Sequence, residues 1–174
     1  MRLEKRHQAI TEERLRLGND FKVRLAALRT RLEAARNNHL GNDIRDVADE
    51  GVMTLTCLAE SIAAQHLALM KKKGMTDDVR DHWLNFVHKE MKVMYDLCAA
   101  EVLNTSSLLP GRREGVVTAS LNFLNDQSRS YISSLEKKLA VESDATDARS
   151  LSERLLAVIG RNTGKSPVNL NFDG

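Results

Sequence analysis

The sequence predicts an all-α fold, and three observations support this prediction. The chain of 174 residues contains only 2 prolines and 9 glycines, so few residues interrupt regular structure. Aromatic residues make up 4% of the chain, and Ala, Leu, Glu, Lys and Arg are abundant, which favours helices over strands. Apolar residues recur at helical spacing over most of the length. We predict an antiparallel bundle of four to five helices, with a long, partly projecting N-terminal helix and an extended C-terminal tail.

Residues 1–38 are predicted to form a basic amphipathic helix. Leu3, Ile10 and Leu17 recur every seven residues, and a broader apolar stripe begins at Phe21. A continuous helix of this length would measure about 55 Å at 1.5 Å per residue. The later helices are predicted to be shorter, so we expect part of this one to overhang the rest of the protein. The run Gly18-Asn19-Asp20 predicts a possible kink at 18–20.

The most apolar stretch, residues 52–70, is expected to be the central helix of the body. Its few polar side chains include Glu60 and His66, which would be costly in lipid, so we predict a core helix rather than a membrane span. A helix that is apolar nearly all round is one that other helices cover. We therefore expect neighbouring helices to enclose this segment on every side.

The body of the protein is predicted to extend over residues 42–160. Within it, helices are expected at 43–73, 77–104 and 116–141, followed by a short fifth helix that ends at Ile159. The connections at 37–42 and 73–77 are short, which favours antiparallel neighbours. Trp83 is expected to be a core anchor. In the tail, residues 161–174, the apolar residues Val168, Leu170 and Phe172 alternate with polar ones, a pattern typical of an extended strand.

No sequence motif indicates catalysis, so we do not predict an enzyme. The run 160–166 is one residue short of a phosphate-binding loop, and Pro167 follows where a helix should begin. Glu4-x-x-His7 matches one element of a di-iron bundle, but a second element is lacking. We therefore predict no metal and no cofactor.

The leading hypothesis is a non-enzymatic helical interaction or regulatory protein that self-associates or docks a protein partner. An overhanging N-terminal helix would expose its seven-residue apolar stripe, and coiled-coil pairing would cover it. The tail would offer a second site, by adding a strand to the edge of a partner's sheet. The candidate partner-binding residues are Leu3, Ile10, Leu17, Val168, Leu170 and Phe172.

Two alternatives come from other classes. A nucleic-acid-binding regulator would use the basic helix to contact phosphates, although acidic residues interrupt its cationic positions and stacking aromatics are lacking. A small-ligand sensor would have a pocket near His66 and Trp83, although His66 is more simply explained as a hydrogen-bonded core residue. The candidate nucleic-acid-binding residues are Arg2, Lys5, Arg6, Arg14, Arg16, Arg24 and Arg31.

The charged N-terminus lacks the apolar core of a signal peptide, which favours a cytoplasmic protein. This prediction leaves open delivery by a route that uses no cleaved signal.

Overall fold

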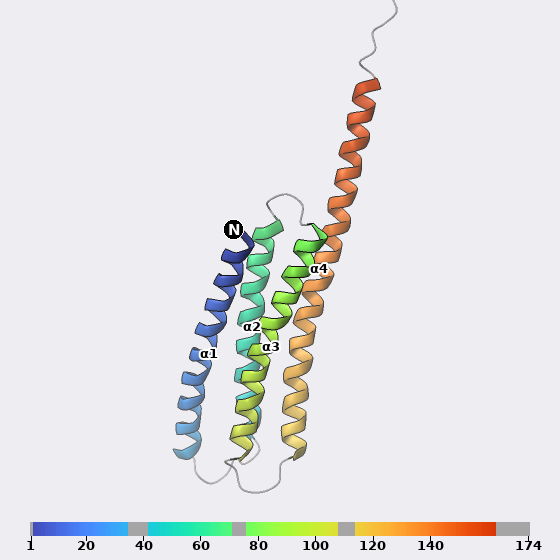
Figure 1. Ribbon diagram of the computed structural model, residues 1–174. Coiled ribbons are helices and arrows are strands. Elements are labelled where there is room, and N and C mark those ends of the chain that lie inside the picture. The colour runs from blue at the N-terminus through green and yellow to red at the C-terminus, as the bar shows by residue number, and fades with distance from the viewer. Residues whose placement is uncertain (1, 35–41, 71–75, 108–113, 163–174) are drawn as a thin grey trace, which may run out of the picture. The chain divides into compact units, whose positions relative to one another are not determined.

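The computed structural model describes residues 2–34, 42–70, 76–107 and 114–162. Within these ranges the secondary structure consists of four helices and no strand, which confirms the all-α prediction. The helices are α1 (Arg2–Ala34), α2 (Asn42–Met70), α3 (Asp77–Ser107) and α4 (Glu114–Asn162), as Figure 1 shows. The chain divides into two compact units, residues 1–137 and 138–174, and α4 runs from the first into the second. The contacts described below belong to the first unit.

Within the first unit, α1 packs on both α2 and α3, and these two also pack on each other. The first part of α4 contacts α2, where the hydroxyl oxygens of Thr56 and Tyr131 lie 2.6 Å apart. Between α1 and α2, Arg6 contacts Gln65 and Arg24 contacts Glu50. Residue numbers therefore rise along α1 as they fall along α2.

A continuous apolar core joins the helices of the first unit. Full burial of a large apolar side chain contributes about 1.5–3 kcal/mol, so this core supplies much of the stability of the unit. Its largest fully buried apolar side chains are Ile10, Phe21, Leu25, Ile44, Leu55, Leu58, Ile62, Trp83, Met91, Met94 and Leu124.

The apolar stripe of the N-terminal helix packs inside the chain. Ile10 is 0% exposed and Leu17 is 5% exposed, whereas Leu3 is half-buried. At Ile10 and Leu17 the expectation of exposed apolar side chains on an overhanging helix is therefore wrong. The reason is that their seven-residue spacing continues the core-facing stripe that includes Phe21 and Leu25.

Two glycines allow helices to approach closely. A Cβ added at Gly18 would lie 3.2 Å from Leu97 Cδ2, and α1 is helical through residues 18–20. A Cβ at Gly51 would lie 3.0 Å from Leu124 Cδ2 and 3.1 Å from Cys98 Cβ. Gly18 thus brings α1 close to α3, and Gly51 lies where α2, α3 and α4 meet. The structure gives Gly18 a packing role within a helix that continues through residues 18–20.

The region predicted to contain a fourth and a fifth helix forms the single helix α4. The expected caps near Ser143 and Thr146 lie in its interior. No glycine or proline occurs between Val116 and Ile159, and Ser, Thr and Asp are only weakly unfavourable inside a helix. A local cluster of capping residues therefore does not end the helix.

Candidate interaction surfaces

One face of α2 is exposed to solvent. Met53 is 52% exposed and Leu67 is 54% exposed, and Cys57, Glu60 and Ala64 between them are also exposed. Steps of four, three, four and three residues place all five on one side of the helix. We call these five residues the α2 stripe. The expectation that neighbouring helices cover this segment on every side is wrong along this face.

The exposed face exists because the neighbouring helices contact the rest of the α2 circumference. Arg24 of α1 donates a hydrogen bond of 2.9 Å to the Thr54 hydroxyl, and Gly51 lies against side chains of α3 and α4. Thr54 is itself fully buried. Three packed neighbours therefore leave one side of α2 uncovered within the described residues.

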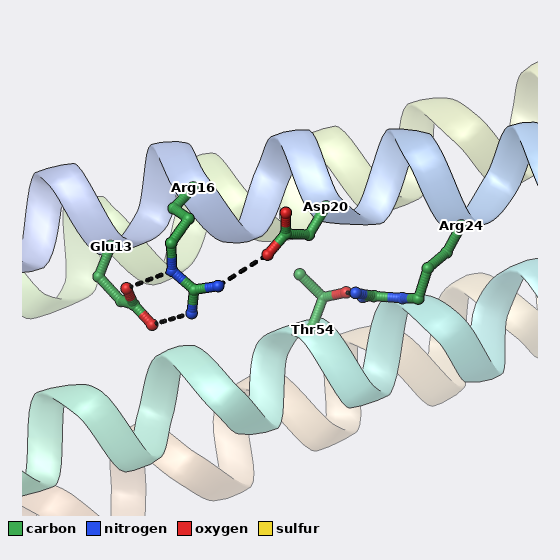
Figure 2. Close-up of polar contacts among 5 residues, drawn as sticks. All are labelled: Glu13, Arg16, Asp20, Arg24 and Thr54. Carbon is green, nitrogen blue, oxygen red and sulfur yellow. Dashed lines mark hydrogen bonds and ion pairs between the residues drawn. The ribbon is translucent and has the colours of Figure 1, made fainter.

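A group of paired charges on α1 borders the α2 stripe. Figure 2 shows Arg16 donating hydrogen bonds to both Glu13 and Asp20. The hydrogen bond from Arg16 lowers the pKa of Glu13. In return, Glu13 is the main cause of a raised pKa at Arg16, and Cys57 also contributes, so this guanidinium lies near the α2 stripe.

A shallow cavity of about 210 Å³ lies where α2 faces α4. Asp49 precedes Met53 by four residues, so the cavity adjoins the α2 stripe. Phe123 is 43% exposed and extends the apolar surface onto α4. The cavity is lined by Arg45, Ala48, Asp49, Ala119, Ser120 and Phe123.

Aromatic and histidine rings gather where α1, α2 and α3 meet. His66 is 1% exposed, and its ring centroid lies 6.5 Å from that of Trp83, which is 0% exposed. The ring of His7 stacks on Phe86 with a centroid distance of 3.9 Å. Trp83 is therefore a core anchor, as predicted. His66 and Trp83 pack against other rings, and neither lines the cavity described above.

Most of the predicted nucleic-acid-binding cations contact other groups of their own chain. Arg14 forms an ion pair of 2.5 Å with Glu90, and Arg24 forms one of 2.8 Å with Glu50. Arg6 donates a hydrogen bond of 2.8 Å to the Gln65 side chain. Since Arg16 is also paired, a phosphate would have to replace existing contacts at four positions.

The remaining candidate residues are placed as follows. Lys5 and Arg31 are exposed, and the Arg2 side chain lies outside the described residues. Val168, Leu170 and Phe172 also lie outside the described residues, so the structure does not test the strand predicted for the tail.

The described residues contain no group of three or more His, Cys, Asp or Glu side chains arranged to hold a metal ion. None of the four helices, over the ranges described, combines the length and apolar character that crossing a membrane requires.

Cys57 and Cys98 are both free thiols, and burial raises the pKa of Cys98 to about 12.

Comparisons of the chain with protein-family models, curated proteins and solved structures find no match. The helical fold and the surfaces described above are therefore the basis for a functional proposal.

Proposed function

We propose that this protein is a non-enzymatic interaction protein, built on an antiparallel helical bundle, that docks a protein partner on the α2 stripe. The observation that carries the proposal is the exposure of Met53 and Leu67, each by more than half, with Cys57 and Ala64 between them. Scattered exposed apolar residues are normal, but a stripe at seven-residue spacing is typical of a helix-packing seam. Covering this stripe would favour binding by about 25 cal/mol for each Å² of apolar surface buried.

The stripe best fits an amphipathic helix that carries a cation. Side chains at alternating steps of four and three residues on α2 interdigitate with the same pattern on a second helix. Glu60 lies in the middle of the stripe, and no ion pair of Glu60 is described within the first unit. A Lys or Arg on the partner would supply the opposite charge at the centre of the interface.

Docking through Leu3, Ile10 and Leu17 is less well supported than docking on the α2 stripe. Ile10 and Leu17 are buried, so α1 would have to leave its neighbours before it could pair with a partner. Nucleic-acid binding along α1 would likewise have to replace contacts such as Arg14 with Glu90. The α2 stripe is exposed without any such rearrangement.

The test uses the full chain and two synthetic amphipathic helical peptides that differ at one position. One peptide places Lys opposite Glu60 and the other places Glu there. We expect the Lys peptide to bind more tightly, and Leu67→Glu to weaken its binding at least about tenfold, which corresponds to 1.4 kcal/mol. The measurement is fluorescence anisotropy of the labelled peptides.

The matched control is Leu103→Glu, because Leu103 is 51% exposed on α3. This variant should bind the Lys peptide as the unmodified chain does. If neither peptide binds, or if Leu67→Glu and Leu103→Glu weaken binding of the Lys peptide equally, the proposal is contradicted. Sedimentation of the chain alone shows whether the α2 stripe is occupied by a second copy of the chain. If the chain forms dimers that Leu67→Glu disrupts, self-association replaces the cationic partner proposed here.

A further inference from the structure

His7 is held in an aromatic and histidine environment on α3. Its ring stacks on Phe86 with an interplanar angle of 18°, and its centroid lies 5.8 Å from Trp83 and 5.3 Å from His82. Its Nε2 atom is buried and has no hydrogen-bond partner among the described residues. We call His7, His82, Trp83 and Phe86 the His7 cluster.

The neutral form of His7 suits this environment better than the charged form. A neutral imidazole can leave Nε2 unprotonated, whereas a protonated ring carries an N–H on both nitrogens. Protonation would therefore create a buried donor without an acceptor, and burial disfavours the positive charge itself. Stacking on Phe86 offsets part of this cost through a cation–π interaction.

Charged and titratable groups face His7 from each neighbouring helix. On α3, His82 opposes a positive charge at His7, and Glu90 favours it, although Glu90 is already paired with Arg14. On α1, Glu4 also favours the charge. From α2, His66 reaches the cluster through its contact with Trp83.

Desolvation is the largest influence on His7. It lowers the pKa of His7 below the ordinary value of 6.5, and His82 lowers it further. Glu90 and Glu4 act in the opposite direction, and the net shift is downward.

We propose that the His7 cluster is an acid-sensitive latch, in which protonation of His7 loosens the first turns of α1 from α3. The change is confined to the residues before Gly18. Residues 5–13 bury one large apolar side chain, Ile10, whereas beyond Gly18 the buried side chains of Phe21, Leu25 and Leu28 hold α1 in place. One protonation is small beside the burial of these three apolar groups.

The sign of the effect follows from proton binding. When the start of α1 is released from α3, His7 has its ordinary pKa of 6.5, and when it is docked the pKa of His7 is lower. At a pH between these two pKa values, the released form therefore binds more protons than the docked form. The stabilisation that His7 gives to the docked form is complete above pH 6.5. It decreases as the pH falls below 6.5 and is fully lost once the pH lies below the pKa of the docked form.

The experiment is amide hydrogen exchange on the full chain at pH 7.5 and pH 5.5, expressed as protection factors to remove the intrinsic effect of pH. We expect protection of residues 5–13 to fall several-fold at pH 5.5, and protection of residues 20–28 to stay constant. In parallel, NMR titration of the His7 ring should give a midpoint below 6.5. The single tryptophan, Trp83, should report the same midpoint through its indole resonance.

The comparison of residues 5–13 with residues 20–28 is made within the unmodified chain, so it does not depend on how well a variant folds. His7→Phe should remove the pH dependence at residues 5–13. His88→Gln should retain it, because His88 is exposed and contacts Glu136 outside the cluster.

Constant protection of residues 5–13 between the two pH values, or a His7 midpoint at or above 6.5, would overturn the proposal. The α2 stripe plays no part in these readouts, so the latch and the docking proposal stand or fall separately.

Discussion

Replacing Trp83 by alanine is expected to lower the free energy of unfolding by about 3–5 kcal/mol. Trp83 is fully buried, and its ring lies 6.1 Å from Phe86 and 6.5 Å from His66. The substitution would leave a cavity where three helices meet, and packed cores relax only partly around such a space. Small domains have total stabilities of about 5–15 kcal/mol, so this single change is a large fraction of the total.

Urea denaturation followed by circular dichroism measures this effect, because the variant has lost the only tryptophan. The control is Val93→Ala on the same helix, where the side chain is 39% exposed. That substitution should change the free energy of unfolding by less than about 0.5 kcal/mol. Equal effects of the two substitutions would show that Trp83 is not a core residue.

Neutralising Glu90 as Glu90→Gln is expected to lower the free energy of unfolding by about 2–4 kcal/mol. The Glu90 side chain is 7% exposed and that of its partner, Arg14, is 19% exposed, so little solvent screens the pair. Glutamine keeps the shape of the side chain but leaves the Arg14 guanidinium half-buried without a counter-charge. The loss therefore reports an uncompensated cation as well as a missing attraction.

The matched control is an ion pair whose two members, Lys92 and Asp96, both lie on α3. Lys92 and Asp96 lie 2.6 Å apart, but their side chains are 72% and 54% exposed. Asp96→Asn should therefore change stability by less than about 0.5 kcal/mol. The double substitution Arg14→Met with Glu90→Leu should recover most of the loss, since an apolar pair can replace a buried ion pair at little cost. If Glu90→Gln and Asp96→Asn have equally small effects, solvent screens the pair between α1 and α3.

The helical class of the fold could be predicted from the sequence because composition and apolar spacing agreed over most of the chain. The core positions Phe21, Leu55 and Trp83 follow from the same spacing. The close approaches at Gly18 and Gly51 could not be predicted, because they depend on side chains of other helices. The sequence around Gly18 predicts only a possible kink, and its close approach to Leu97 depends on a residue of α3.

The candidate sites were harder to predict because exposure depends on which helices are neighbours. Ile10 and Leu17 read as a thin seven-residue stripe, but in the structure they continue the core face of α1. The signal for the α2 stripe was present in the sequence. The core positions of that helix leave Met53, Cys57 and Leu67 on the opposite side, where polar residues would be expected. That signal was obscured because the whole segment is apolar, so no face stood out as solvated.

The central claim is that α2 has an exposed face beside a closed core, and its two cysteines test this claim directly. Cys57 lies on the α2 stripe, and Cys98 of α3 is 0% exposed with a pKa raised to about 12. In the native chain, an aromatic disulfide reagent should modify one thiol quickly and the second only after unfolding in urea. Cys57→Ser should abolish the fast reaction, and Cys98→Ser should preserve it. A native chain with no reactive thiol would show that the α2 stripe is covered and would contradict the account.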